Sequence, residues 1–379
     1  MENKNLTICF LGSAATIHTL KWADYFSRKG HNVHLCSYEP VLKGYDLGNI
    51  KLHSLKKKIP IDIWPFSSIL NLPFLRKTII ELVKEIKTDI VHSHYATSYG
   101  SLGVLSDFHP FVLTVWGSDI LITPQKFLPS KLSVKYYLKK ADLITCDAGH
   151  IKEAMIKLGA SKSKIKIINF GIDTEKFRPG IFNEKLKEKL RIKNKKVVIS
   201  LRSLDPIYDI ETLIKTASIV VKKYSRVKFI IAGNGPQKEE LENLVENLNI
   251  SDKIIFTGYI SNNEIPFYLG VSDIYVSTSL SDAGISSSTA EAMACGLPVV
   301  ITDNGENRTW VKEGNGGFLI KERNPKVLAE KIIFLLKNED KGKNFGIENR
   351  KTIIKRNDYH NEMSKMEEIY YKLVNKKEL

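Results

Sequence analysis

The chain has 379 residues, of which 43% are hydrophobic and 26% charged, and its formal net charge is +15. This length predicts two domains of ordinary size, and the composition is typical of a soluble globular protein. No apolar run approaches the roughly 20 residues that span a bilayer, and the first residues lack the apolar core of a signal peptide. We therefore expect a cytoplasmic protein without a transmembrane helix.

The spacing of the cysteines and the net charge limit which metals and macromolecules the protein is expected to bind. Cys9, Cys36, Cys146 and Cys295 lie far apart and form no CxxC pair, which argues against a zinc site or a disulfide framework. Residues 1–170 carry roughly +10 of the charge, which favours nucleic acid, anionic membrane or phosphorylated substrates. Because no RNA-binding aromatic motif, zinc finger or helix-turn-helix pattern is present, a membrane surface is favoured over nucleic acid.

Short apolar runs alternate with helical periods along almost the whole chain, and these runs are the expected strands. A first set comprises Leu6–Gly12, Val33–Cys36, Ile90–His94, Phe111–Trp116, Leu143–Cys146 and Ile165–Phe170. A second set comprises Val197–Leu201, Phe229–Ala232, Ile254–Thr257, Ile274–Ser277, Val299–Ile301 and Gly317–Ile320. Strict alternation of strand and helix predicts parallel sheets covered on both faces, and two sets predict two Rossmann-like domains.

The turn after the first expected strand contains Gly12 and is followed by His18. A glycine there lets a ligand approach the backbone at the carboxyl edge of the sheet, although an ordinary strand–helix turn has the same sequence. The absence of G-x-G-x-x-G argues against a nicotinamide dehydrogenase.

Two later strands of the first half also end in polar or aromatic side chains. His94 and Tyr95 follow the strand that begins at Ile90, and Trp116 and Asp119 follow the strand that begins at Phe111. Residues just past the carboxyl ends of parallel strands face the binding crevice, so all four are candidates for substrate contact. A purely structural histidine at position 94 fits the pattern as well.

Residues 51–77 interleave basic and aromatic side chains. Such a loop followed by a helix suits docking on anionic lipid head groups. A solvated basic loop whose aromatic side chains reach the core is the alternative.

In the second half, the strand Ile274–Ser277 leads into a turn of small and hydroxyl residues and then a helix that contains Glu291. The unpaired N–H groups at such a helix start favour anions, and the Glu291 carboxylate could accept hydrogen bonds from ribose hydroxyls. A tightly packed helix with Glu291 as a cap partner is the structural alternative. Arg202, at the end of the strand from Val197, could clamp a phosphate in bidentate fashion or lie at the surface.

These motifs resemble those of the family 4 glycosyltransferases, which are retaining enzymes of the GT-B fold. The resemblance rests on EAMACGLPVV (291–300), on IIAGNGP (230–236), on DIVHSH (89–94) and on NFGIDTEKFRP (169–179), which is similar to the interdomain segment. It implies two domains facing each other across a cleft: residues 1–170, which bind the acceptor, and residues 171–356, which bind a nucleotide-sugar. It also implies that a final helix, about 357–379, packs back on the first domain.

The resemblance assigns roles to individual residues. It implies catalytic roles for Arg202, Glu291 and Asp282. It implies donor contacts by Gly12, Ser203, Gly233, Asn234, Tyr259, Gly284, Ile285, Ser286, Ser287, Ser288 and Glu291. It implies acceptor contacts by His18, His94, Tyr95, Trp116 and Asp119.

The sequence departs from the family pattern at three positions. Ala283 stands where relatives have a glutamate that contacts the transferred sugar, and Ile207 where they have a lysine. Trp116 replaces a histidine. No Asp-x-Asp motif is present, which fits the family's metal-independent mode, and no cofactor is expected beyond the nucleotide-sugar substrate.

The expected function is transfer of a sugar with retention to a hydroxyl of a lipid-linked or cell-surface glycan intermediate, with peripheral contact to an anionic membrane. Two alternatives are a nucleotide-sugar epimerase of GT-B fold and a sugar-nucleotide-binding protein whose catalysis has decayed. The three departures suggest the second alternative.

Overall fold

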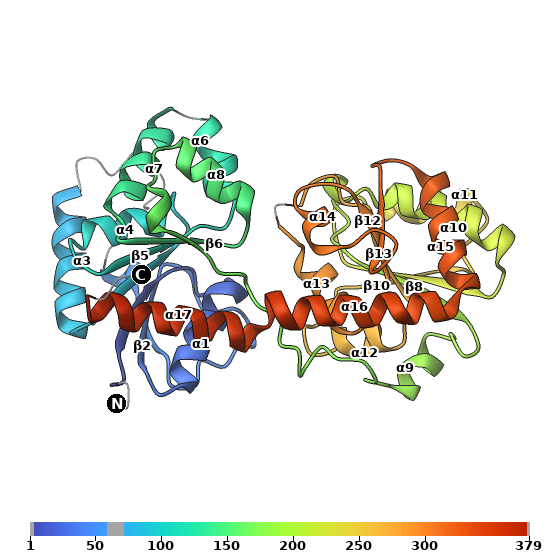
Figure 1. Ribbon diagram of the computed structural model, residues 1–379, viewed down its shortest axis with the longest axis horizontal. Coiled ribbons are helices and arrows are strands. Elements are labelled where there is room, and N and C mark those ends of the chain that lie inside the picture. The colour runs from blue at the N-terminus through green and yellow to red at the C-terminus, as the bar shows by residue number, and fades with distance from the viewer. Residues whose placement is uncertain (1–3, 59–71, 127, 283, 377–379) are drawn as a thin grey trace. The chain divides into compact units, whose positions relative to one another are not determined.

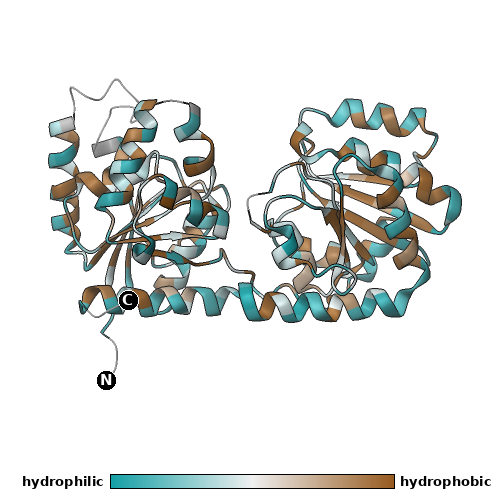
Figure 2. Cartoon of the chain, turned by 45° about the horizontal axis from the view of Figure 1, so that its top comes forward, coloured by the Kyte–Doolittle hydropathy of each residue, from teal (hydrophilic) through white to brown (hydrophobic). Residues whose placement is uncertain are grey.

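The computed structural model describes residues 4–58, 72–126, 128–282 and 284–376. The chain forms two compact units (Figure 1). The first unit comprises residues 1–170 and 360–379, and the second comprises residues 171–359. In each unit, apolar strands lie between helices whose outer surfaces are mostly hydrophilic (Figure 2).

The first unit contains a seven-stranded sheet in which all neighbours pair in parallel. The strand order is β3-β2-β1-β4-β5-β6-β7. The strands are β1 (Thr7–Leu11), β2 (Asn32–Ser37), β3 (Lys51–Ser54), β4 (Ile90–His94), β5 (Phe111–Thr114), β6 (Leu143–Cys146) and β7 (Ile165–Ile167). Successive strands are added on one side of β1 up to β3 and then on its other side from β4 onward. Ligands bind α/β sheets at such a switch point, which here lies between β1 and β4.

Helices cover both faces of this sheet. They are α1 (Ile17–Arg28), α2 (Leu55–Lys58), α3 (Leu72–Ile86), α4 (Tyr99–Leu105), α5 (Ser118–Leu121), α6 (Thr123–Lys126), α7 (Leu128–Lys140), α8 (Gly149–Lys157) and α17 (Tyr359–Val374). The final helix, α17, joins the first unit through side-chain hydrogen bonds. Glu367 accepts from Nε2 of His31 at 3.1 Å, and the buried Tyr370 hydroxyl pairs with Nδ1 of His92.

The second unit contains a six-stranded sheet in which all neighbours are again parallel, in the order β10-β9-β8-β11-β12-β13. The strands are β8 (Lys196–Leu201), β9 (Val227–Ala232), β10 (Ile254–Gly258), β11 (Ile274–Ser277), β12 (Val299–Thr302) and β13 (Gly317–Ile320). The corresponding switch point lies between β8 and β11.

The helices of the second unit pack on this sheet. They are α9 (Glu184–Lys189), α10 (Ile210–Lys223), α11 (Lys238–Asn247), α12 (Ile265–Gly270), α13 (Ser287–Ala294), α14 (Asn307–Trp310), α15 (Pro325–Lys337) and α16 (Glu339–Asn357). Gly171 begins the unit with φ +76°, and a Cβ there would lie 2.6 Å from the Cα of Tyr359. Only glycine fits this close approach of the unit's two ends.

The two parallel sheets predicted from the alternating pattern are confirmed, and β3 is the strand that the pattern missed. Its sequence, KLHS, has a single aliphatic residue, and its burial is low because it lies at the sheet edge. The predicted basic and aromatic segment therefore starts as a strand, while residues 59–71, including Trp64 and Phe66, lie outside the described residues. Arg76, from the same segment, pairs with Asp107 at 2.7 Å.

No helix in the described ranges combines the length and the apolarity that crossing a bilayer requires.

Candidate functional site

The backbone after β8 holds Arg202 in one position. Gly233 has φ +152°, and a Cβ on it would lie 2.2 Å from the Arg202 carbonyl oxygen. A Cβ on Gly235 would lie 2.4 Å from the Leu204 carbonyl carbon. The loop after β9 can therefore pack directly on the loop after β8 only because both positions are glycine.

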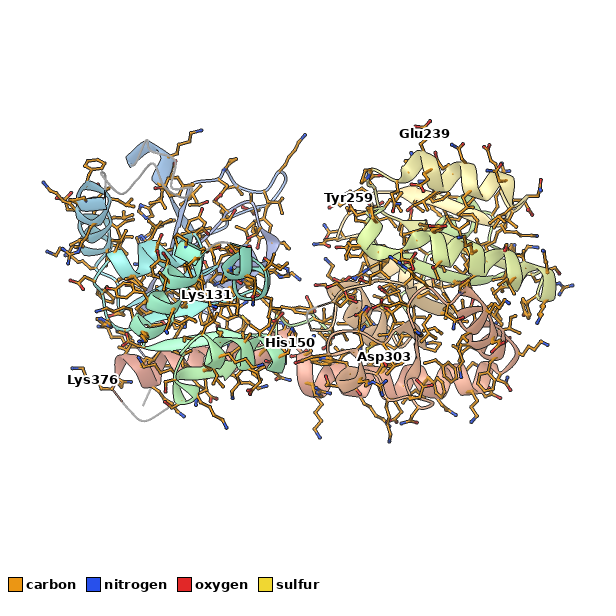
Figure 3. All side chains as sticks on the ribbon, turned by 90° about the horizontal axis from the view of Figure 1, so that it is seen from above. Lys131, His150, Glu239, Tyr259, Asp303 and Lys376 are labelled. Atoms are coloured by element: carbon orange, nitrogen blue, oxygen red, sulfur yellow. The ribbon has the colours of Figure 1, made fainter. Side chains whose placement is uncertain are left out.

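Hydrogen bonds tie the loops of three adjacent strands together at the carboxyl edge. The Asn234 carbonyl accepts from the Leu204 N–H at 3.0 Å and from the Ser203 hydroxyl at 2.7 Å. The Gly233 N–H donates to the Gly258 carbonyl, which ends β10, at 2.9 Å. Tyr259 follows with 77% of its surface exposed (Figure 3), so its ring is available to a ligand.

Arg202 forms a buried charge pair at this edge. Its Nη2 pairs with the Asp282 carboxylate, and less than a tenth of either side chain is exposed. The guanidinium also lies 4.5 Å from the ring centroid of Tyr208, and its buried Nε has no acceptor among the described residues. A buried guanidinium so held cannot rotate freely, and its remaining donors are set for an anion.

This pairing gives Asp282 a place that the sequence did not predict. The resemblance implied a catalytic role for Asp282, and the structure shows its carboxylate bound to Arg202 and 3.4 Å from the Ser279 hydroxyl. Asp282 thus positions Arg202. The neighbouring Ala283, at the position of the family's sugar-contacting glutamate, lies outside the described residues.

The small-residue turn ends at Ser286, which caps α13. Its hydroxyl accepts a hydrogen bond from the Thr289 N–H at 3.3 Å. The next hydroxyl residues support the turn, since Ser288 bonds the buried Tyr275 hydroxyl at 2.8 Å. Gly284 and Ile285 are buried beneath it, which leaves the first N–H groups of α13 at the sheet edge.

Glu291, one turn into α13, is 7% exposed. Burial raises the pKa of the Cys295 thiol to about 12, with the Glu291 charge adding to the effect and the Arg350 charge opposing it. Glu291 therefore lies close to the Cys295 thiol. Arg350 in turn donates to the carbonyls of Phe177 and Ala294 at 3.0 and 2.7 Å.

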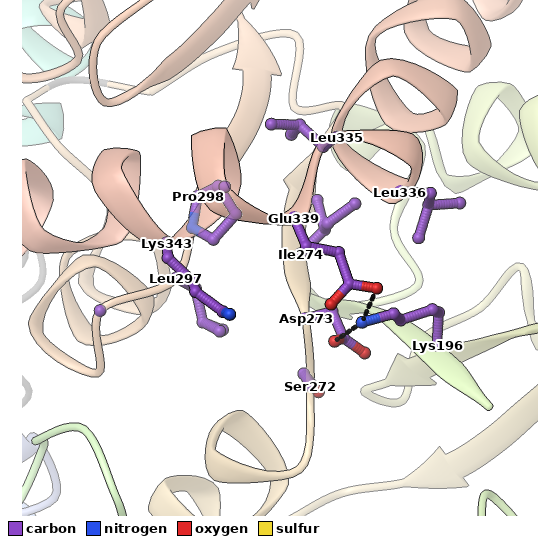
Figure 4. A pocket seen from close by; sticks show the side chains of 12 residues that line it. Lys196, Ser272, Asp273, Ile274, Leu297, Pro298, Leu335, Leu336, Glu339 and Lys343 are labelled. Atoms are coloured by element: carbon purple, nitrogen blue, oxygen red, sulfur yellow. Dashed lines mark hydrogen bonds and ion pairs between the residues drawn. The ribbon is translucent and has the colours of Figure 1, made fainter. Parts of the chain in front are cut away.

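A pocket at the opposite, amino edge of the same sheet has a different character (Figure 4). It measures about 240 Å³, and Lys196 projects into it from the start of β8. The Lys196 amino group lies 3.2 Å from Asp273 and 2.9 Å from Glu339. Because Lys196 already pairs with both carboxylates and no predicted residue lines the pocket, we assign it a structural role.

The first unit has a pocket of about 500 Å³ at the carboxyl edge of its own sheet. Four of the predicted acceptor residues line it: His18, His94, Tyr95 and Trp116. Gly12 lies beneath, where a Cβ would come within 2.9 Å of the Thr19 methyl group and 3.4 Å of His94. The structure thus brings Gly12 to this pocket, although the resemblance had assigned it to the donor.

The histidines of this pocket are neutral at physiological pH. The rings of His18 and Trp116 stack with centroids 4.9 Å apart. Burial lowers the pKa of His18 to about 4, with the Lys21 charge adding to it, and burial lowers the pKa of His94 to about 3. The Nδ1 of His94 lies 3.4 Å from the Thr19 hydroxyl, and its buried Nε2 has no partner among the described residues. That nitrogen can bond a polar group of a ligand.

Asp119 does not line the pocket. It is fully buried, and its carboxylate accepts hydrogen bonds from the N–H groups of Ala96, Trp116 and Gly117 at 2.7, 3.1 and 3.0 Å. Burial raises the pKa of this carboxyl to about 6 although these bonds oppose the rise. Asp119 therefore fixes the loops that carry Tyr95 and Trp116.

The sequence pattern did not predict the residues that form the pocket wall opposite His94. Glu39 and Tyr99 line it, and the Tyr99 hydroxyl donates to the Glu39 carboxylate while accepting from the Tyr38 N–H at 3.0 Å. The sequence does contain a signal for this wall, because Tyr38 and Glu39 directly follow β2 at the same carboxyl edge.

Across the described ranges, no group of three or more His, Cys, Asp or Glu residues is placed to hold a metal ion.

Family models match both units. The model of group 1 glycosyl transferases matches residues 182–352, and a glycosyl transferase 4-like model matches residues 7–148. An uncharacterized glycosyltransferase of Methanocaldococcus jannaschii is 30% identical over 294 residues, which cover 76% of each chain. The alpha-monoglucosyldiacylglycerol synthase of Streptococcus pneumoniae is 28% identical over 59% of this chain, and the match spans only 54% of that relative.

The fold has close counterparts among solved structures. The crystal structure of Anabaena HepE in complex with UDP superposes with a TM-score of 0.77 at 18% identity, covering 96% of this chain and 99% of that one.

Proposed function

Because the chain belongs to the family 4 glycosyltransferases and has the GT-B fold, we propose that its second unit binds a nucleotide-activated sugar and its first unit an acceptor hydroxyl. The sugar is transferred with retention of its anomeric configuration, as the family's mechanism implies. UDP, which the HepE structure contains, is the first nucleotide to test.

The observation that carries the proposal is the fixed position of Arg202. It is buried at the switch point of the sheet, held by Asp282 and stacked on Tyr208. An arginine kept rigid in a low-dielectric place stabilises charge on a departing phosphate without having to reorganise during the reaction. The start of α13, capped by Ser286, adds N–H groups and a favourable helix dipole at the same edge.

Glu291 completes the proposed donor site. Its carboxylate accepts hydrogen bonds from the ribose hydroxyls, and Tyr259 lies over the base. Ser203, Gly233 and Asn234 shape the backbone that the nucleotide approaches.

The reaction exchanges one bond at the anomeric carbon for another. The bond from that carbon to the donor phosphate oxygen breaks while the acceptor oxygen bonds the same carbon from the same face. The acceptor proton passes to the leaving phosphate, so no protein side chain serves as general base. Arg202 and the N-terminal N–H groups of α13 bear the charge that develops on the phosphate. The transfer uses no metal ion and no further cofactor.

The acceptor is a lipid-linked or cell-surface glycan intermediate. Two features support this proposal: the uncharged His94, Tyr95 and Trp116 side chains on one wall of the pocket, opposite the Glu39 carboxylate, and the relative named alpha-monoglucosyldiacylglycerol synthase. Aromatic side chains beside hydrogen-bonding groups suit a hydroxyl-bearing group attached to an apolar or sugar body. The protein then works in the cytoplasm, in peripheral contact with the membrane.

A thermal-shift panel of UDP-, GDP-, ADP- and CMP-sugars tests the donor site. One nucleotide should raise the melting temperature of the wild type, and both Arg202→Ala and Glu291→Ala should abolish that shift. Arg28→Ala, which removes an exposed arginine from α1, is the control and should keep it. Unchanged shifts in both site variants would refute the donor assignment.

A sugar-nucleotide-binding protein without turnover is the second candidate, and Ile207 favours it. This side chain, 45% exposed, stands where relatives carry a phosphate-binding lysine. Measuring donor consumption with and without lipid extract separates the candidates. A transferase consumes donor only with acceptor, an epimerase converts donor without acceptor, and a decayed enzyme binds donor but consumes none.

A further inference from the structure

The outer face of α7 carries an exposed apolar stripe that the transfer chemistry does not use. Leu128, Leu132 and Tyr136 follow one another at four-residue spacing and so lie in one row along the helix. Their exposed fractions are 67%, 60% and 51%. Among the described residues, Leu128 and Leu132 are the two most exposed large aliphatic side chains.

This stripe is not needed to attach α7 to the first unit. The inner face of the helix does that through Val134 and Leu138, which are fully buried in the core of the unit. A surface helix normally has one apolar face and one polar face. A second, exposed apolar row therefore indicates a surface that is covered by a partner.

The charges on α7 indicate what that partner is. The helix contains Lys131, Lys135, Lys139 and Lys140 and no acidic residue. In the part of the chain that the structure describes, none of these four amino groups pairs with a carboxylate; Lys140 lies 5.7 Å from the ring centroid of Tyr136. An apolar row flanked by lysines is the pattern of a helix that lies in the interface of an anionic bilayer.

A pocket of about 500 Å³ extends this surface between α5, α6, α7 and α8. Ile120, Leu121 and Leu158 give it apolar walls, and Lys131 and Lys157 line it together with one acid, Glu153. The helices α6, α7 and α8 gather at the top of the first unit in Figure 1, and Figure 3 looks down on that side, where Lys131 and His150 are labelled. Apolar and basic groups thus continue beyond the helix itself.

We propose that the outer face of α7 docks the first unit on a membrane surface rich in anionic lipid. The proposal rests on the proposed function in one respect, which is that a lipid-linked acceptor gives the docking a purpose. It differs from the basic segment 51–77 in position and in the residues that carry it. A second copy of the chain fits less well, because a two-fold contact through α7 would bring two sets of lysines together.

Vesicle co-sedimentation of the full chain, without donor or acceptor, tests the surface. The wild type should bind vesicles of phosphatidylcholine mixed with phosphatidylglycerol and bind pure phosphatidylcholine more weakly. The double variant Leu128→Asp and Leu132→Asp should lose at least about tenfold in partitioning, because two apolar side chains no longer enter the interface. Replacing Lys131, Lys135 and Lys139 with Glu should remove the preference for anionic vesicles.

The matched control is Ile347→Asp with Ile354→Asp, which changes two exposed aliphatic residues of α16 in the second unit and should bind as the wild type does. Melting temperatures of all variants check that the exposed substitutions leave the fold intact. Wild-type binding by the Leu128/Leu132 variant would overturn the proposal, as would a wild-type dimer that this variant converts to monomer without any vesicle binding. Donor thermal shifts should be unchanged in the α7 variants, and vesicle binding unchanged in Arg202→Ala, so the two proposals fail independently.

Discussion

The carboxyl edges of the two sheets follow the same order of strands but differ in how their buried polar groups are charged. In the second unit the edge holds a buried charge pair, Arg202 with Asp282, and a buried carboxylate, Glu291. In the first unit the edge holds a pocket whose histidines, His18 and His94, stay uncharged because burial lowers the pKa of each. Under the proposed function, one architecture binds the donor phosphate at one edge and the acceptor hydroxyl at the other.

The contrast arises because the two edges offset the cost of burying a polar side chain in different ways. Arg202 remains charged inside the protein because a carboxylate lies against it, and an unpaired buried charge would cost several kcal/mol. His94 has no such partner and is kept neutral instead.

Removing the charge at the second edge should have the largest effect. Arg202→Ala should lower kcat/KM by about 10²–10³-fold, since one preorganised donor to a developing negative charge is worth that much. Steady-state turnover of the nucleotide-sugar measures it. Arg28→Ala serves as the control, and a loss below tenfold in Arg202→Ala would show that the charge pair does not act on the donor.

A substitution that disturbs the packing around Arg202 should have nearly as large an effect. In Gly233→Ala the new Cβ would lie 2.2 Å from the Arg202 carbonyl oxygen, so the two loops must separate. We expect a loss of about 2–4 kcal/mol in the free energy of unfolding, together with weaker donor binding. Gly314→Ala is the matched control: φ there is +71°, but no atom lies within 4 Å of the added Cβ, so only about 1 kcal/mol should be lost.

Between pH 7 and pH 5, protonation of histidines should lower the stability of the first unit alone. All nine histidines of the chain lie in it, and the pKa values of His18 and His94 are lowered from 6.5 to about 4 and about 3. Below pH 6.5 the unfolded chain binds protons that the folded unit does not, so stability is full above pH 6.5 and falls toward pH 4. His18 and His94 should each cost about 2 kcal/mol between pH 7 and pH 5, and protonation of Asp119, whose pKa burial raises to about 6, should offset part of that loss.

Calorimetry of the full chain across that range checks this prediction. The transition of the first unit should move to lower temperature while that of the second stays in place. His94→Gln should reduce the slope with pH, and equal shifts of both transitions would contradict the assignment.

The smallest effect should come from the acceptor pocket. Trp116→Ala removes the ring that stacks on His18, and we expect the acceptor KM to rise about tenfold through loss of a stacking surface. The donor Kd should not change, because Trp116 belongs to the first unit. A change in donor Kd without a change in acceptor KM would move Trp116 to the other site.

Much of the fold could be predicted from local pattern. Most of the buried strands contain a short apolar run that identified them, whereas β3, an edge strand of half-exposed residues with a single aliphatic side chain, contains none. His94, Tyr95 and Trp116 were predicted together because residues past the ends of parallel strands share one edge.

The rest depended on contacts that no local pattern encodes. Asp282 is 80 residues from Arg202, and nothing in either motif shows that they pair. Asp119 occupies an expected site position, but its carboxylate accepts hydrogen bonds from three backbone N–H groups and is therefore buried instead of lining the pocket. Glu39 reaches the pocket only because β2 lies beside β1 and the Tyr99 hydroxyl holds its carboxylate.

A crystal structure of the chain with an intact nucleotide-sugar tests the central claim most directly. The account predicts donor phosphate oxygens within hydrogen-bond distance of the Arg202 guanidinium and ribose hydroxyls at the Glu291 carboxylate. The donor assignment would be contradicted if nucleotide density lay in the pocket of Lys196 or in the pocket of His94. It would also be contradicted by density anywhere else that leaves Arg202 bound to Asp282 alone.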